Sequence, residues 1–206
     1  MNDDLKHKIK KSLNVNNELF IKGQIYKDVL SKRDLWEKLA GLYNGKFIIK
    51  QTVSKDVTSF KLEIPYKNYN LVLTESDTKP LKFATELKLN RKFEFRISLE
   101  DSFDRIMKLF GKQDIQIEDK EFDKKYFIQS KDPGLILKLL TSGQIKQIIL
   151  KHNIYLLNLE YSRKNETHQL LTYKDRNTND QETLMELIQF EFSIIDFFEN
   201  KKIIRN

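Results

Sequence analysis

The stretch GKQDIQIEDKEFDKKYFIQSKDPGLILKLL, residues 111–140, shows more of the fold than any other part of the chain. Its residues 115–117 and 126–129 have the apolar, β-rich character of short strands. The acidic residues 118–123 between them predict a turn. The sequence DPG at 132–134 predicts the start of a helix, because proline fits the first helical turn, where its missing N–H costs nothing. Two strands followed directly by a helix indicate a mixed domain.

Upstream of this stretch, from residue 46 to about residue 97, apolar residues alternate with polar ones. Five such runs follow one another, with turns between them at residues 68–70 and 90–91. A period of two is typical of strands with one buried and one solvated face. The pattern predicts an antiparallel meander whose inner face carries six large apolar residues: Phe60, Leu62, Phe83, Leu87, Phe93 and Phe95.

Helical periods flank these strands. A helix is expected over residues 34–43, ended by Asn44-Gly45 in a left-handed conformation, and another over 103–110, opened at Ser98 or Asp101. One kinked helix or two short ones are expected over 135–150. The last helix is expected over 180–200, where one broad stripe at helical spacing indicates a buried side: Leu184, Leu187, Ile188, Glu191, Ile194, Ile195 and Phe198.

These patterns predict an α+β fold, with helices packed on one face of an antiparallel meander sheet and a long C-terminal helix. A hairpin is expected from residues 155–161 and 168–173. Residues 1–33 form a basic N-terminal segment ahead of an α+β domain over 34–206. That domain is either one unit or two subdomains dividing near residue 100.

Composition excludes several classes of protein. Apolar residues make up 39% of the 206 residues and aromatic ones 11%, which is enough for a buried core. No cysteine is present, so disulfide-stapled domains and thiolate metal sites are excluded. No signal peptide and no run of about 20 apolar residues, the length of a membrane span, is apparent. The expected location is the cytoplasm.

The charge is uneven. Of the net +7, most belongs to residues 1–50, with 11 basic and 6 acidic side chains, whereas residues 111–206 carry 15 of each. Four lysines crowd the N-terminal segment and are the candidate binding residues: Lys6, Lys8, Lys10 and Lys11. Such a segment can contact an acidic protein surface or anionic lipid. The alternative is an ordinary solvated surface.

Catalytic motifs are scarce. The chain has 6 glycines and no glycine-rich phosphate loop. The acidic residues 118–123 lack the glycine of a metal-binding loop, so no metal and no cofactor is expected. One alternative is a nuclease of the D…ExK type, in which Asp77 and Glu86 hold Mg²⁺ and Lys88 orients the attacking water. Against it, Lys82 shares their face, which is typical of an ordinary polar strand face.

Nucleic acid is a less favoured partner. The aromatic residues alternate on the buried side of the strands rather than standing exposed among basic residues. Most basic residues are lysines, whereas bidentate base contacts use arginine.

Residues 121–150 resemble a segment found in a group of uncharacterised bacterial proteins of unknown function. In that group a Phe-Asp pair precedes a basic-aromatic strand, a Ser-x-Asp turn and a helix that ends in Leu-Leu-Thr. The resemblance extends over about residues 80–160 and implies no activity. The matching residues are Phe122, Asp123, Phe127, Ser130, Asp132, Leu139, Leu140 and Thr141.

The sequence therefore predicts a non-enzymatic, cytoplasmic bacterial protein that binds another protein with an acidic surface. An immunity or defence-associated protein is one form of this prediction. The alternatives are the metal-dependent nuclease and a peripheral protein of the membrane surface. The oligomeric state is left open.

Overall fold

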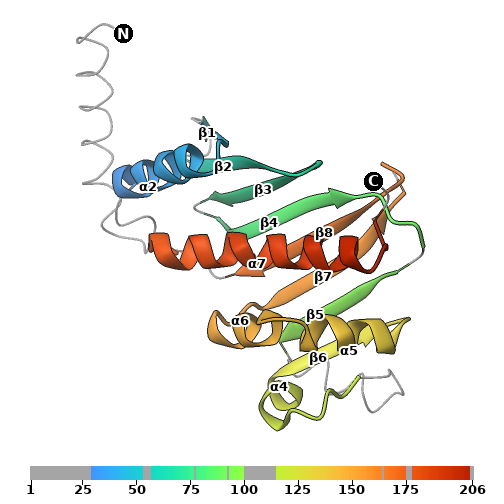
Figure 1. Ribbon diagram of the computed structural model, residues 1–206. Helices are drawn as coiled ribbons and strands as arrows, with labels where there is room; N and C mark the ends of the chain where they lie inside the picture. The colour runs from blue at the N-terminus through green and yellow to red at the C-terminus, as the bar shows by residue number, and fades with distance from the viewer. Residues whose placement is uncertain are drawn as a thin grey trace, which may run out of the picture.

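The structure is a computed structural model, and it describes residues 29–52, 57–76, 78–91, 93–99, 115–163, 165–174 and 178–204. The described residues form eight strands and five helices (Figure 1), which in chain order are α2 (Val29–Leu42), β1 (Lys46–Thr52), β2 (Val57–Tyr66), β3 (Tyr69–Ser76), β4 (Lys79–Leu87), β5 (Phe95–Leu99), α4 (Lys120–Lys125), β6 (Tyr126–Ser130), α5 (Pro133–Thr141), α6 (Ile145–Lys151), β7 (Leu156–Ser162), β8 (Thr167–Lys174) and α7 (Gln181–Asn200).

The strands form one antiparallel sheet in the order β1-β2-β3-β4-β8-β7-β5-β6. β1 to β4 are the predicted meander, and β7 with β8 is the predicted hairpin. The predicted α+β class, the antiparallel sheet and the long C-terminal helix are confirmed. Strands from both sides of residue 100 share this sheet, because β8 and β7 lie between β4 and β5.

β5 is the strand that departs from the predicted meander. It pairs with β6 and β7, while β8 occupies the edge of β4 where a meander would place β5. The C-terminal segment holds the chain at this point: Leu89 bridges to Ile204, and the Asn90 side-chain amide donates to the carbonyls of Lys202 and Ile204, each at 3.2 Å. Alternation of polar and apolar residues defines the face of a strand and not its neighbour.

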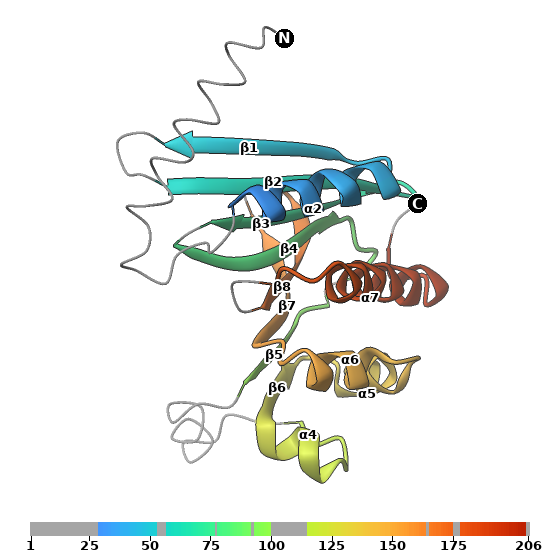
Figure 2. The ribbon, with the colours of Figure 1, turned by 90° about the vertical axis from the view of Figure 1, so that its left-hand side faces the viewer.

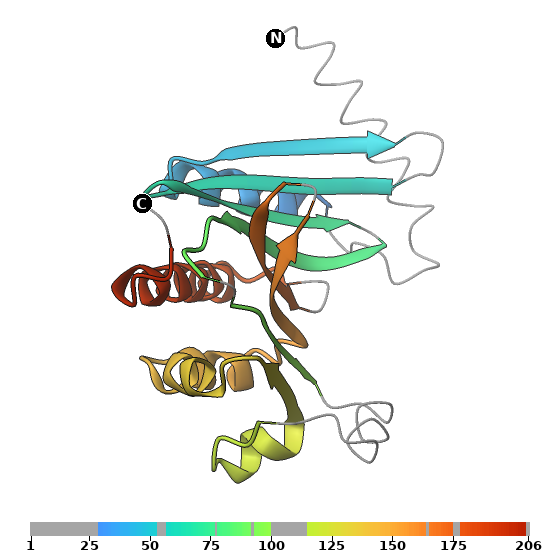
Figure 3. The ribbon, with the colours of Figure 1, turned by 90° about the vertical axis from the view of Figure 1, so that its right-hand side faces the viewer.

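The helices α2, α5, α6 and α7 lie on one face of the twisted sheet. Figures 2 and 3 view the molecule from opposite sides, with α2 in front of β2 in Figure 2 and behind it in Figure 3. We call this side of the sheet the core face, and the side that no described helix covers the open face. All six residues predicted for the inner face are buried.

α2 packs on the core face through Trp36 and Leu39, which are fully buried. The Trp36 ring lies 6.1 Å from that of Phe47 and 5.9 Å from that of Phe60. The predicted stop is confirmed, since Asn44 has a φ of 50°. At Gly45, a Cβ would lie 2.6 Å from the Glu63 carbonyl, so only glycine lets β1 approach β2 here.

The helix α2 begins at Val29, before the start at residue 34 that the sequence predicted. Its first turns carry Lys32, whose ammonium lies 2.5 Å from a carboxylate oxygen of Glu75 on β3, and both side chains are buried. This ion pair links the start of α2 to the sheet.

Two predictions for residues 115–125 are wrong. Residues 115–117 form no strand, and the expected acidic turn contains the helix α4. Asp119 caps α4 by accepting from the backbone N–H of Glu121 and Phe122, and Asp123 accepts from the backbone N–H of Ile117 and Asp119. The carboxylates therefore satisfy backbone donors that a helix start leaves without partners.

The rest of the opening stretch follows the prediction. β6 covers the expected strand, and Asp132 caps α5 by accepting from the Leu135 N–H at 2.9 Å, with Pro133 in the first turn. The helix then breaks at Gly143, which has a φ of 55°, so residues 133–151 form two helices. The helix expected over 103–110 lies outside the described residues.

α7 runs across the middle of the core face (Figure 1), and all seven residues of its predicted stripe are buried. One of them is Glu191, whose side chain would be ionised in water but has no exposed surface here. Burial raises its pKa from 4.5 to about 8, and the hydroxyl of Thr172 on β8 has a smaller, opposite effect on it. Among the described residues, neither carboxyl oxygen makes a hydrogen bond of good geometry.

Candidate functional site

On the open face of the sheet, basic and acidic side chains lie toward opposite ends of the strands. Cross-strand partners project to the same side of a sheet, so the register places Lys61 beside Thr74 and Lys82 beside Tyr173 toward one end of the strands. Toward the other end, Gln169 lies between Glu86 and Glu160. The open face therefore has a basic end on β2 to β4 and an acidic end on β4, β8 and β7.

The basic end contains a hollow of about 790 Å³. We call it the lysine hollow. Its lining comes from β1, β2, β3, β4 and β8 and includes four lysines, one carboxylate and several hydroxyl groups: Lys50, Lys61, Lys79, Lys82, Glu75, Ser59, Thr74, Ser76, Thr78 and Tyr173.

Contacts within the lysine hollow leave it positive. Glu75, its single carboxylate, pairs with the buried Lys32 behind it. The Lys61 ammonium lies 2.6 Å from a carboxylate oxygen of Glu63, and this contact lowers the Glu63 pKa. The Lys82 ammonium lies over the Tyr173 ring, 5.8 Å from its centre. A positive hollow lined by hydroxyl groups is suited to carboxylate or phosphate groups.

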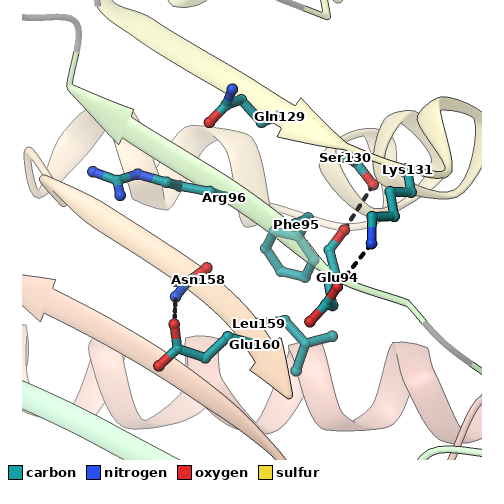
Figure 4. Close-up of a pocket in the computed structure, with 9 residues that line it drawn as sticks. All are labelled: Glu94, Phe95, Arg96, Gln129, Ser130, Lys131, Asn158, Leu159 and Glu160. Atoms are coloured by element: carbon teal, nitrogen blue, oxygen red, sulfur yellow. Dashed lines mark hydrogen bonds and ion pairs between the residues drawn. The ribbon is translucent and has the colours of Figure 1, made fainter. Parts of the chain in front are cut away.

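A second hollow, of about 410 Å³, lies on the open face over β5, β6 and β7 (Figure 4). We call it the arginine hollow. Its lining has two basic and two acidic side chains, with amide and hydroxyl groups among them: Arg96, Lys131, Glu94, Glu160, Gln129, Asn158 and Ser130. Its charges therefore balance, in contrast to those of the lysine hollow.

Three of the four charged groups of the arginine hollow have partners. Glu94 accepts from the Tyr161 backbone N–H at 3.2 Å and from the Lys131 ammonium at 3.3 Å, and these contacts, the backbone one first, lower its pKa. Glu160 accepts from the Asn158 amide at 2.8 Å. Figure 4 shows Arg96 apart from both carboxylates, between Gln129 and Asn158.

A third hollow lies between the α5–α6 connection and α7, with a volume of about 300 Å³. Its one charged group is Glu186, which accepts from the Lys151 ammonium at 2.7 Å and lies 2.9 Å from the His152 ring nitrogen. These contacts lower the Glu186 pKa. We interpret them as packing between α6 and α7.

Most residues that the sequence put forward as sites lie elsewhere or outside the described residues. The four lysines of the N-terminal segment and Asp77 are not among the described residues. Glu86 and Lys88 are exposed on one side of the chain with buried Leu87 between them. Glu86 accepts from the Asn165 amide at 2.8 Å.

Of the three residues of the nuclease alternative, Glu86 and Lys88 lie among the described residues and Asp77 does not. Within the described ranges, no group of three or more His, Cys, Asp or Glu side chains could hold a metal ion.

The nuclease alternative can be tested directly. We expect Glu86→Ala to change the free energy of unfolding by less than about 0.5 kcal/mol, as for most exposed strand residues. Mg²⁺ and Mn²⁺ are expected to leave the melting temperature unchanged. Metal-dependent cleavage of DNA or RNA by the unaltered protein, lost in Glu86→Ala, would instead establish the nuclease.

Sequence reasoning missed the lysine hollow and the arginine hollow. Lys61 and Lys82 are visible as the polar members of alternating strands, but Lys82 meets Tyr173 only because β4 pairs with β8, 91 positions away in the chain. Arg96 likewise meets Asn158 through the pairing of β5 with β7. The signal that was present is the concentration of lysines on the polar faces of β1, β2 and β4.

Comparison with known proteins gives the fold alone. No protein-family model matches the chain, and no curated protein matches it. Among solved structures, it is similar to the crystal structure of the mycobacterial trehalose monomycolate transport factor A, TtfA, with a TM-score of 0.52 and 8% sequence identity, over 83% of this chain and 96% of that one. No helix in the described part of the chain is long and apolar enough to cross a membrane. The chain thus shares its overall fold with TtfA.

Proposed function

We propose that this is a non-catalytic bacterial binding protein, which holds an acidic segment of another protein in the lysine hollow. The observation that carries the proposal is the convergence of Lys50, Lys61, Lys79 and Lys82 on one hollow whose single carboxylate is already paired with Lys32. The unpaired excess of positive charge favours a partner with carboxylate groups.

The shape of the hollow supports a chain segment as the ligand. Four strands and the adjoining β8 contribute to its lining, and at about 790 Å³ it is large enough for several side chains. Among its hydroxyl groups, Ser59 already donates to the Lys50 carbonyl, whereas Ser76 and Thr78 share one hydrogen bond, so one of their two O–H groups can donate to a carboxylate oxygen. The position on the open face leaves the approach clear of the described helices.

The non-catalytic part of the proposal draws on the likeness to TtfA, which is named a transport factor. The proposed partner is the one that the sequence predicted, a protein with an acidic surface. The proposed contact surface is the lysine hollow on the sheet, in addition to the N-terminal lysines. A cytoplasmic location, and a role in immunity or defence, complete the proposal.

A charge-reversal experiment tests it. The probe is a fluorescently labelled hexaglutamate peptide, with binding followed by anisotropy at low and high salt. We expect Lys50→Glu/Lys79→Glu to weaken binding by at least about tenfold at low salt, since two attractive contacts become repulsive. Both side chains are exposed, so the fold is expected to remain intact. Screening at 0.15 M salt, with a Debye length of about 8 Å, should reduce the difference.

The control is Lys38→Glu/Lys120→Glu, which makes the same change in net charge at exposed positions on α2 and α4. It should bind hexaglutamate nearly as well as the unaltered protein. Equal weakening in both double variants would mean that net charge alone attracts the peptide, and the proposed site would be wrong.

A further inference from the structure

The arginine hollow is built on a row of three polar side chains that crosses three strands. Arg96 on β5 pairs in register with Gln129 on β6 and with Asn158 on β7. Directly opposed residues in an antiparallel sheet have Cβ atoms about 5 Å apart and project to the same side. Both amides therefore flank the guanidinium on the open face (Figure 4).

Arg96 is the group in this row that is available to a ligand. It is exposed, and within the part of the chain that the structure describes its guanidinium has no hydrogen-bond or ion-pair partner. Glu94, the residue just before β5, already accepts hydrogen bonds from the Tyr161 backbone N–H and the Lys131 ammonium. A planar guanidinium with free N–H groups binds a carboxylate through two parallel hydrogen bonds.

A negative group lies on the other side of Asn158. Glu160 lies on β7 two residues beyond Asn158, so it projects to the same side of the sheet as Asn158, diagonally across from Arg96. It is exposed and accepts one hydrogen bond, from the Asn158 amide at 2.8 Å. A carboxylate has about four acceptor positions, so most of those of Glu160 stay available.

We propose that the arginine hollow binds a small zwitterion of the α-amino acid class. The ligand carboxylate lies on the Arg96 guanidinium, and its ammonium group lies on the Glu160 carboxylate. Asn158 connects the two poles, and Gln129 on the far side of Arg96 provides a further donor and acceptor for the ligand. The volume of about 410 Å³ is that of a small-molecule site.

The balanced charge of the hollow favours a zwitterion over a simple anion. An anion on Arg96 would lie on the same side of the sheet as the Glu160 carboxylate, and like charges repel. An ammonium group on the same ligand turns that repulsion into attraction. The site is independent of the lysine hollow, which is formed by other residues at the opposite, basic end of the open face.

Three matched ligands test the carboxylate and the ammonium group of the zwitterion separately. The probe is L-alanine, with propionate as the analogue that lacks the ammonium group and ethylammonium as the analogue that lacks the carboxylate. Binding is followed by NMR through the side-chain signals of Arg96, Gln129 and Asn158. We expect saturable shifts with alanine, and binding at least about tenfold weaker for either one-pole analogue, since each loses a charge-assisted hydrogen bond.

Variants of the protein complete the test. Arg96→Gln and Glu160→Gln should each weaken alanine binding by about tenfold or more, whereas Arg163→Gln, at an exposed arginine in the β7–β8 turn, should leave it unchanged. The proposal is wrong if alanine gives no saturable shift, if propionate binds as tightly as alanine, or if Arg96→Gln binds as well as the unaltered protein. The hexaglutamate experiment is unaffected by any of these outcomes.

Discussion

Replacing Glu191 with leucine is expected to stabilise the protein at pH 7 by about 3 kcal/mol. Glu191 is fully buried on the side of α7 that faces the sheet, and its pKa is raised from 4.5 to about 8. At pH 7 folding must therefore protonate a carboxyl that is ionised in the unfolded chain, at a cost of about 1.4 kcal/mol for each pH unit above 4.5. A leucine at this position has nothing to protonate, and it adds apolar contacts to the core.

The same change should alter the pH dependence of stability. A carboxyl with a raised pKa in the folded state contributes stability that is fully present below pH 4.5 and is lost as pH rises to about 8. The measurement is urea unfolding of the unaltered protein, Glu191→Leu and Glu191→Gln at intervals from pH 4.5 to 8.5. The advantage of both variants over the unaltered protein should grow through this range and then level off.

Comparing proteins at each pH removes the contribution of other titrating groups, such as His168, whose pKa is lowered by burial. The control is Glu166→Gln, at an exposed turn position, which should follow the unaltered protein at every pH. A pH-independent difference between Glu191→Gln and the unaltered protein would show that Glu191 does not change its ionisation on folding.

The second large effect concerns the ion pair between α2 and β3. Lys32→Met is expected to destabilise the protein by about 3–5 kcal/mol, because it leaves the Glu75 carboxylate buried without its cation. The double variant Lys32→Met/Glu75→Leu removes both charges, and we expect it to recover most of the loss. Two apolar side chains in this position can pack against the core where the pair is now buried.

Chemical unfolding of the single and double variants measures this coupling as a double-mutant cycle. The matched control is Lys38→Met, a change at an exposed lysine of the same helix, for which a change within about 0.5 kcal/mol is expected. A double variant as unstable as Lys32→Met alone would mean that packing of the lysine side chain, rather than its charge, holds α2 on the sheet.

The faces of the strands and helices were readable from the sequence. Period-two spacing identified Phe60, Leu62, Phe83 and their neighbours as the inner face, and the helical stripe of α7 placed even Glu191 among the buried residues. Both patterns arise from the direction in which successive side chains project, which is a local property of the backbone. Asp132 and Pro133 identified the start of α5 for an equally local reason.

Other features depended on contacts between distant parts of the chain. The place of β5 follows from the pairing of β4 with β8 and from the C-terminal segment at Asn90. The helix α4 was missed because its six residues are too few for a helical period, and the acidic residues around Asp119 are equally common in turns. The lysine hollow and the arginine hollow each include strands that are far apart in sequence, so no sequence pattern groups their residues.

The order of the strands has a consequence for how the chain folds during synthesis. β5 leaves the ribosome before either of its neighbours, β6 and β7, has been made, and the free edge of β4 waits for β8. Until about residue 174 has emerged, one edge of β4 and one edge of β5 lack the partners that they have in the finished sheet, and unpaired strand edges are the usual starting points of aggregation. Completion of the sheet is thus one late event, in which the β7–β8 hairpin enters between strands that already exist. Pairings between strands this far apart in sequence form slowly, so we expect these two edges to stay exposed until the β7–β8 hairpin has been made.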